Sequence, residues 1–253
     1  MKSVFASGVA QHEVFTGFIE HFATRGEILA AGKRNTIKLF RHDDKVYAVK
    51  SFGKPNIFNA VAYGFLRKSK ARRSFEFAQR LLELGIGTPA PIAYFEERGL
   101  LFGRSFYCSE YLVPDLLFKD LVAQPNYPDG ETILRQFTKF SFDLHEKGVE
   151  FLDHTPGNTL IFKKDEGRYT FMLVDLNRML FNRKLSFAQR MKNLCRLTPR
   201  RDMIVTMANE YAAHYKLPET RVFDLLWNCT CAFQKAFQRK KDIKRKLGLA
   251  KDS

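Results

Sequence analysis

Three short motifs, in a fixed order along the chain, carry residues that could act together in one reaction. Lys50 ends Val-Tyr-Ala-Val-Lys, Asp153 and Asn158 begin and end Asp-His-Thr-Pro-Gly-Asn, and Asp175 ends Phe-Met-Leu-Val-Asp. They supply a cation for phosphate groups, a carboxylate base and two oxygen ligands for a divalent metal. The set predicts phosphoryl transfer from ATP with Mg²⁺, in which Lys50 and Asp153 are catalytic and Asn158 and Asp175 hold the metal.

The sequence around each motif predicts the element that must position it. Residues 46–52 alternate β-branched, aromatic and small side chains, so Lys50 should project from a strand. The apolar pair before Asp175 places that carboxylate at the end of another strand. Residues 131–147 have apolar side chains at helical spacing, and Gly148 is the expected C-terminal stop. The loop that carries Asp153 follows this helix directly.

The order of the expected elements indicates an α+β fold with two lobes. Strands dominate from residue 27 to residue 112, interrupted by a long helix over residues 69–84 that ends at Gly85. After Pro114 the chain reads as mostly helical, with a short strand pair near residues 160–174. We therefore predict a small β-rich N-lobe over residues 1–112 and a larger, mostly helical C-lobe over residues 113–253. A helix over residues 233–247 can pack its apolar stripe on the C-lobe and leave a cationic face for lipid headgroups, and a solubilising helix with no partner is the alternative.

Composition limits the class of protein. The chain has 253 residues and 45% hydrophobic content, enough for one or two ordinary cores. No segment approaches the roughly 20 apolar residues of a membrane span, and the first residues lack the apolar core of a signal peptide. We therefore expect a cytoplasmic protein. The four cysteines lack the spacing of a zinc site, so we expect buried, reduced thiols.

The net charge of +15 bears on which molecules the protein could bind. Basic residues cluster in three segments, residues 67–73, 178–201 and 235–246. Solvated helix faces would explain such clusters, and so would nucleic acid, an anionic membrane surface or a polyanionic substrate. Charge alone does not choose among these partners.

Several motifs together resemble one family. The chain resembles the lipopolysaccharide core sugar kinases, which include kinases of 3-deoxy-manno-octulosonic acid (Kdo) and have a protein-kinase-like fold. The resemblance rests on Gly-Lys-Arg-Asn-Thr-Ile-Lys at 32–38, Ala-Val-Lys at 48–50, Ser-Lys-Ala-Arg-Arg-Ser-Phe-Glu at 69–76, Leu-His-Glu-Lys-Gly at 144–148, the Asp153 loop, and Asp-Leu-Asn-Arg at 175–178.

The resemblance implies a nucleotide site in the N-lobe. Lys50 would neutralise the α and β phosphates of ATP, and Glu76 would orient Lys50 through an ion pair. Glu83 is the rival for that role, and Glu76 could instead pair with Arg72 or Arg80 along its own helix. Gly32, Lys33, Arg34 and Asn35 would cover the phosphates, although an ordinary basic hairpin turn is the alternative. Backbone groups of Glu110 and Leu112 would bind adenine.

Departures from the protein-kinase pattern indicate which kind of molecule accepts the phosphate. Phe151 and Leu152 stand where protein kinases carry His-Arg, Thr155 stands where serine/threonine kinases carry a lysine, and no Ala-Pro-Glu anchor follows Asp175. Asn177 replaces the glycine after the metal-binding aspartate. These departures favour a small-molecule or sugar acceptor over a peptide. His154 could contact that acceptor or be a structural loop residue.

The favoured function is an ATP-dependent kinase of a sugar hydroxyl on a lipid-anchored anionic saccharide, with Kdo on a lipid A precursor as the first candidate. The basic helices would then face lipid A and the cytoplasmic surface of the inner membrane, and nucleic acid is disfavoured. An atypical protein kinase, a kinase of a soluble small molecule, and a catalytically silent module that binds membrane or RNA remain as alternatives. The sequence does not indicate an oligomeric state.

Overall fold

The computed structural model describes residues 1–32, 35–53, 68–97 and 103–247. The chain forms two compact units, Met1–Pro114 with Met172–Arg178, and Asp115–Phe171 with Met179–Ser253. The segment that carries Asp175 therefore belongs with the first unit, although it lies far along the chain. The first unit contains the sheet, and most of the helices lie in the second.

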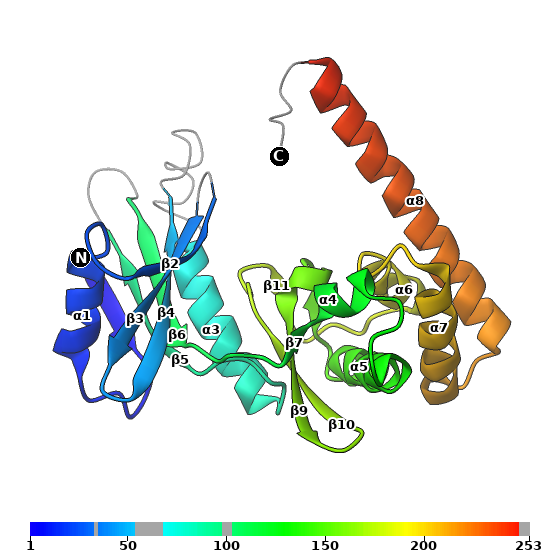
Figure 1. The fold of residues 1–253 in the computed structure, drawn as a ribbon, viewed down its shortest axis with the longest axis horizontal. Coiled ribbons are helices and arrows are strands. Elements are labelled where there is room, and N and C mark those ends of the chain that lie inside the picture. The colour runs from blue at the N-terminus through cyan, green and yellow to red at the C-terminus, as the bar shows by residue number, and fades with distance from the viewer. Residues whose placement is uncertain (33–34, 54–67, 98–102, 248–253) are drawn as a thin grey trace. The chain divides into compact units, whose positions relative to one another are not determined.

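The first unit is built on a six-stranded sheet with the order β1-β5-β6-β4-β3-β2 (Figure 1). Its strands are β1 (Lys2–Phe5), β2 (Glu27–Ala31), β3 (Asn35–His42), β4 (Lys45–Phe52), β5 (Pro91–Glu96) and β6 (Ser105–Glu110). Every neighbouring pair is antiparallel. In this register Lys50 lies between Ile37 on β3 and Tyr107 on β6, so the predicted phosphate-binding lysine stands on an inner strand.

Two helices, α1 (His12–Glu20) and α3 (Lys70–Glu83), pack against this sheet. Phe15 and Ile19 of α1 share a core cluster with Tyr47 and Val49 of β4. Phe75 of α3 shares a different cluster with Phe52 of β4. Because side chains alternate along a strand, Lys50 points to the same face as Phe52, which is the face that α3 covers.

The second unit is mostly helical. Its helices are α4 (Phe118–Ala123), α5 (Gly130–Glu146), the short η1 (Pro156–Asn158), α6 (Phe187–Leu194), α7 (Arg201–Tyr215) and α8 (Glu219–Lys246), and its strands are β7 (Leu116–Leu117), β8 (Glu150–Phe151), β9 (Thr159–Asp165), β10 (Arg168–Leu173) and β11 (Met179–Leu180). The last residues of β10 belong to the first unit. The core of the unit joins Phe137 of α5, Met207 and Tyr211 of α7, and Leu226 of α8.

The end of α5 leads directly into the loop that carries Asp153. Apolar residues at helical spacing, among them Ile133, Phe137 and Leu144, bury one face of α5, as the sequence predicts. The helix ends before Gly148, whose φ of +70° is in the left-handed region that glycine adopts without strain. Strand β8 then pairs with β11, with Phe151 opposite Met179, and fixes the start of the loop.

The C-terminal helix α8 differs from the expectation. Its first half is anchored in the core through Val222, Leu226 and Thr230, and Phe233 packs at the edge of that core. Beyond this point the apolar stripe is exposed, with 58% exposure for Phe237, 48% for Ile243 and 64% for Leu247. The expectation that the stripe packs on the C-lobe is wrong, because the core of the unit ends near Phe233 and α8 continues past it (Figure 1).

Within the described residues, no helix is long and apolar enough to cross a bilayer.

Candidate functional site

The first unit brings Lys50 and Asp175 together. Their Nζ and Oδ1 atoms are 2.6 Å apart, and only 14% of the lysine side chain is exposed, against 36% of the aspartate. Asp175 follows β10 and has a left-handed backbone with φ of 57°. Two hydrogen bonds tie Leu173, at the end of β10, to the first unit. Its amide donates to the Gly87 carbonyl at 2.9 Å, and its carbonyl accepts from the Thr88 hydroxyl at 2.8 Å.

Asn177 supports the carboxylate of Asp175. Its Nδ2 group donates to Asp175 Oδ1 at 2.7 Å. The sequence marks Asn177 as a departure from the glycine of protein kinases, and the structure shows what the side chain does there. The carboxylate is therefore held by an ammonium group and an amide, while about a third of the side chain stays open to solvent.

The expected ion pair between Lys50 and Glu76 is not formed in the described part of the chain, which corrects that prediction. Glu76 instead pairs with Lys68 at 2.7 Å and with Arg72 at 2.8 Å. Burial raises the pKa of Glu76, but the hydrogen bonds from these two cations outweigh it and leave the pKa below its usual value. The rival Glu83 pairs with Arg80 near the end of α3. Both glutamates have closer cations of their own, and Lys50 has Asp175.

The predicted phosphate loop connects β2 and β3. The amide of Gly32 donates to the carbonyl of Asn35 at 2.9 Å, which closes a hairpin, and Lys33 and Arg34 lie outside the described residues. The Oδ1 atom of Asn35 is buried and accepts no hydrogen bond from a described residue. An unsatisfied buried oxygen of this kind calls for a donor or a cation, which is consistent with a ligand at the loop.

Lys38, the last residue of the same motif, has a structural role. Its amino group donates to the carbonyls of Phe22 at 2.7 Å and Arg25 at 2.9 Å, just after α1. Its side chain is therefore used to hold the chain after α1 against the sheet.

The predicted adenine contacts lie at the end of β6. The amide of Glu110 donates to the Ala90 carbonyl at 2.9 Å, so only the carbonyl of Glu110 stays a candidate for adenine. Leu112 lies beyond the strand, where its amide and carbonyl bond no other described residue.

The second unit contains the loop of the predicted base. Asp153 follows β8, and Asn158 is the last residue of η1. The Asn158 Nδ2 group donates to the Asp153 carbonyl at 2.8 Å, which fixes the orientation of the amide. The Oδ1 atom of Asn158 makes no hydrogen bond to a described residue, so this oxygen can act as a metal ligand.

His154 is a structural residue of that loop. It is fully buried, and its Nδ1 atom lies 3.4 Å from Asn193 Oδ1 on α6. Asn193 Oδ1 is also 3.1 Å from His145 Nε2 on α5, and its Nδ2 group donates to the Phe151 carbonyl at 2.8 Å. Burial lowers the pKa of His145 to about 4 and that of His154 to about 3. Asn193 therefore joins two neutral histidines and the backbone that precedes Asp153.

Arg196, three residues further along, contacts the same loop. Its Nη1 group donates to the Leu152 carbonyl at 2.8 Å and lies 3.7 Å from Asp153 Oδ1. The sequence assigned no role at the Asp153 loop to Asn193, Arg196 or His145, although His145 belongs to the motif at 144–148. Their types and local spacing carry no signal, because they meet the loop through long-range packing, and Arg196 was read only as part of a basic segment.

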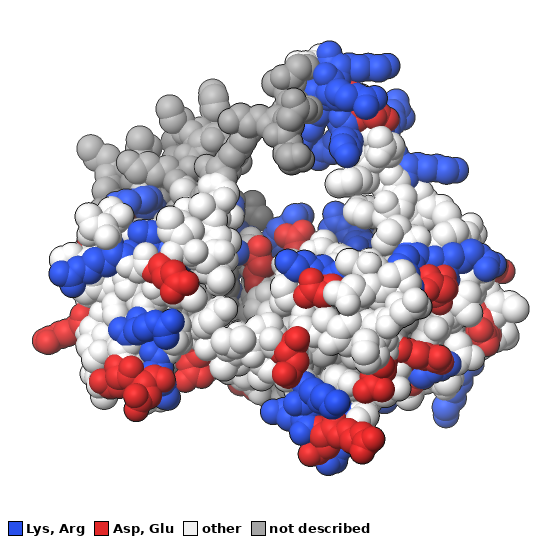
Figure 2. Space-filling model, viewed as in Figure 1, with Lys and Arg blue, Asp and Glu red and all other residues white. Residues whose placement is uncertain are grey.

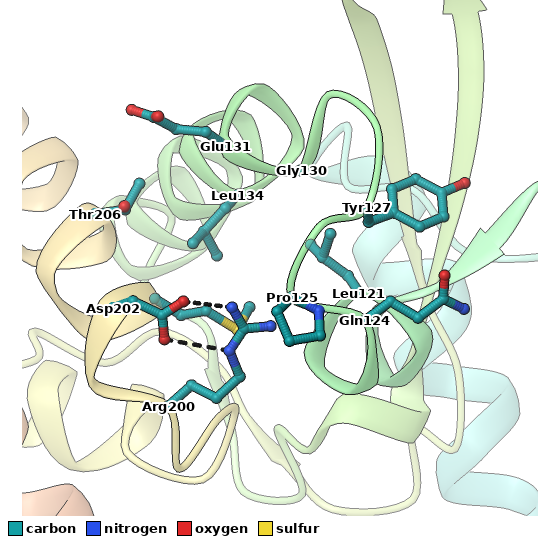
Figure 3. A pocket seen from close by; sticks show the side chains of 11 residues that line it. Leu121, Gln124, Pro125, Tyr127, Gly130, Glu131, Leu134, Arg200, Asp202 and Thr206 are labelled. Atoms are coloured by element: carbon teal, nitrogen blue, oxygen red, sulfur yellow. Dashed lines mark hydrogen bonds and ion pairs between the residues drawn. The ribbon is translucent and has the colours of Figure 1, made fainter.

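A separate pocket of about 280 Å³ lies in the second unit (Figure 3). Leu121, Leu134 and Met203 give it apolar surface, and Arg200 and Asp202 meet there in an ion pair. None of the predicted site residues lines this pocket, and its third charged residue, Glu131, pairs with Arg135 outside the lining.

The kinds of side chain at the predicted positions suit a nucleotide and a hard metal ion. Lys50 supplies a partly buried cation, and Asp175 and Asn158 supply a carboxylate and an amide oxygen, which suit Mg²⁺. Lys50 and Asp175 belong to the first unit, and Asn158 and Asp153 to the second.

Comparison with known proteins decides the family. The model of the lipopolysaccharide kinase (Kdo/WaaP) family matches residues 31–215, which include every predicted site residue. The chain belongs to this family. The resemblance stated from the sequence is thereby confirmed, and membership in this family of kinases makes the protein a phosphotransferase of lipopolysaccharide synthesis.

Solved structures agree on the fold. The chain is similar to WaaP in the structure described as "WaaP in complex with acyl carrier protein", with a TM-score of 0.64, 16% sequence identity, and coverage of 94% of this chain and 99% of that chain. The kinase-like α+β fold predicted for this family member is confirmed. A search of curated proteins gives no match.

Proposed function

We propose that this lipopolysaccharide kinase uses ATP and Mg²⁺ to phosphorylate a hydroxyl of Kdo on a lipid A precursor. The observation that carries the proposal is the pair formed by Lys50 and Asp175 at 2.6 Å, between the middle of one strand and the segment after another. A lysine and an aspartate so placed are the phosphate-binding and metal-binding parts that phosphoryl transfer needs.

Each residue then has one task. Lys50 would bind the phosphates of ATP, and Asp175 and Asn158 would each offer an oxygen ligand to Mg²⁺. The metal would supply charge neutralisation at the phosphates. Asp153 accepts a hydrogen bond from the acceptor hydroxyl, orients its oxygen toward the γ-phosphate and takes up its proton as the bond to phosphorus forms. ADP leaves with the former bridging oxygen.

The basic surface of the chain supports an anionic, lipid-anchored acceptor. Lys and Arg side chains gather over the last turns of α8 (Figure 2), where Phe237 and Ile243 are exposed among them. A helix end of this composition suits the interface of an anionic bilayer. The protein would then work as a peripheral protein on the cytoplasmic face of the inner membrane. The protein-kinase, soluble small-molecule and silent-module alternatives each leave this surface or the complete catalytic set without a use.

Mass spectrometry of the glycolipid tests the proposal in cells. In a strain that lacks this gene, the Kdo region should lose one phosphate, and the wild-type gene should restore it. The Asp153→Asn variant, expressed at the same level, should not restore it. An unchanged phosphate content in the deleted strain would reject Kdo as the acceptor.

A further inference from the structure

Arg196 holds a fixed position beside the proposed base. Its guanidinium donates to the Leu152 carbonyl at 2.8 Å, and its Cζ atom lies 5.1 Å from the ring centroid of Phe233 on α8. Phe233 itself packs at the edge of the core. One backbone carbonyl and one aromatic face therefore orient the arginine, and its planar group is held in place before any ligand arrives.

The contact between Arg196 and Asp153 contributes too little folding stability to explain why the arginine is held there. The closest atoms are 3.7 Å apart, and the two side chains are 35% and 27% exposed. Ion pairs as open and as long as this one add little to folding stability, because water and salt screen them. The Nε and Nη2 groups of Arg196 donate to no other described residue, so the arginine keeps donors for a ligand.

The distance to Asp153 limits where an acceptor can lie. A hydroxyl that bonds Asp153 Oδ1 lies within about 3.2 Å of that oxygen, so it is within about 7 Å of Arg196 Nη1. An anionic substituent on a neighbouring carbon of the same sugar can therefore reach the guanidinium directly. Arginine matches a carboxylate through two parallel hydrogen bonds, and this geometry adds specificity as well as attraction.

We propose that Arg196 binds a carboxylate of the acceptor sugar and thereby selects acidic sugars over neutral ones. This proposal rests on the proposed function, because it assigns a specificity-determining residue to the same acceptor site. A phosphate of the acceptor or of ATP offers related chemistry, so the experiment must separate these anions from the sugar carboxylate.

The test compares two soluble acceptors, a deacylated Kdo-containing lipid A precursor and the same compound with the Kdo carboxyl reduced to an alcohol. Both keep the lipid A phosphates. For the wild type, reduction should lower kcat/KM for the acceptor by roughly 10², the loss expected when a buried or half-buried charged partner is removed. Arg196→Gln should lose about as much on the carboxylated acceptor and change less than about threefold on the reduced one. Arg196→Lys should have a kcat/KM on the carboxylated acceptor between those of the wild type and Arg196→Gln, because lysine keeps the charge but cannot form two parallel hydrogen bonds.

Arg221→Gln is the matched control, since Arg221 also lies over an aromatic ring, that of Phe187 at 5.9 Å, and among the described residues it forms no hydrogen bond or ion pair with the Asp153 loop. It should behave as the wild type on both acceptors, and KM for ATP should be unchanged in every variant.

Three outcomes would overturn the assignment. If the wild type uses both acceptors equally, the site does not recognise the carboxylate. If Arg196→Gln lowers kcat/KM by the same factor on the carboxylated and the reduced acceptor, Arg196 only positions the base. If the variant raises KM for ATP, Arg196 binds the nucleotide phosphates instead. The comparison of acceptors on the wild type stands even if a variant does not fold. A wild type that transfers phosphate to neither acceptor would instead count against the proposed function.

Discussion

Lys50 and Asp175 form an ion pair and neutralise each other. The lysine is mostly buried, so its ammonium group needs an anion nearby, and the carboxylate of Asp175 supplies one at 2.6 Å. ATP phosphates can take over this role, which would release Asp175 for a metal. Under the proposed function, the pair holds in place the two charged groups that would bind phosphate and metal.

This view of Lys50 gives a first prediction. Lys50→Met should lower kcat by roughly 10²–10³, because one preorganised charge on the phosphates is lost. Lys139→Met is the matched control, since Lys139 also pairs with an aspartate, Asp143, at 2.6 Å but on the surface of α5. Steady-state kinetics with saturating acceptor measures both variants. Equal rates for the two variants would contradict the role of Lys50.

The two buried histidines that contact Asn193 give a prediction about the pH dependence of stability. His145 and His154 have pKa values lowered to about 4 and about 3, mainly by burial, whereas histidine in an unfolded chain titrates near 6.5. The unfolded state therefore binds protons first, and the free energy of unfolding should fall as the pH drops from about 6.5 toward 4, with no such slope at higher pH. Thermal unfolding followed across this range measures the slope.

His145→Gln should flatten that slope, because it removes one of the two groups that must stay neutral. His214→Gln, at a partly exposed position on α7 beside Glu210, is the control and should keep the slope. Identical slopes for wild type and His145→Gln would show that the acid sensitivity comes from other groups.

At the scale of elements, the turn between α5 and β8 sets the position of the Asp153 loop. A Cβ atom on Gly148 would lie 3.0 Å from the carbonyl oxygen and 3.1 Å from the amide nitrogen of Arg183, and the residue has positive φ. Gly148→Ala should therefore destabilise the protein by about 1–3 kcal/mol. Gly157→Ala, where a Cβ meets nothing within 4 Å, should change stability little. Urea denaturation compares the two, and equal midpoints would contradict the strain argument.

The exposed half of α8 gives a prediction about membranes. Each cation near an anionic leaflet contributes about 1 kcal/mol, so reversing four of them to Glu should remove most binding to phosphatidylglycerol vesicles. The reversed set is Lys240, Lys241, Lys244 and Arg245, and the control set, exposed elsewhere on the second unit, is Lys163, Lys164, Arg168 and Lys184. Vesicle flotation at low salt measures the difference. Binding that is equal in both variants, or absent in the wild type, would reject a membrane role for α8.

Local periodicity accounts for most of the elements that the sequence predicted. The helix expected over residues 69–84 is α3 with Ser69 as its N-cap, and that expected over residues 131–147 is α5. Strand β1 and helix α1 were not predicted, although Phe15 and Ile19 of α1 have helical spacing. Local spacing also offered the pair of Glu76 with Arg72 along α3, which the structure forms at 2.8 Å. The exposure of the α8 stripe and the Asn193 network depend on which surfaces meet, and no local pattern carries that information.

At the scale of the whole molecule, the net charge of +15 divides into two kinds of cation. Some are internal parts of the fold, such as Lys38 beside α1 and Arg190, which is buried and bonds Glu146 and the Tyr211 hydroxyl. Others remain on the surface, above all at the end of α8 (Figure 2). The net charge counts buried and surface cations alike, but only the surface cations can attract an anionic partner.

Transfer of labelled phosphate by the purified protein tests the central claim most directly. With ATP labelled at the γ-phosphate and a Kdo-containing lipid A precursor, the wild type should place one phosphate on Kdo, only when Mg²⁺ is present. Asp153→Asn should reduce the rate by roughly 10²–10⁴ while its nucleotide affinity stays nearly unchanged, because Asp153 acts on the acceptor hydroxyl. An unlabelled acceptor with the wild type, or an Asp153→Asn rate within threefold of it, would contradict the account.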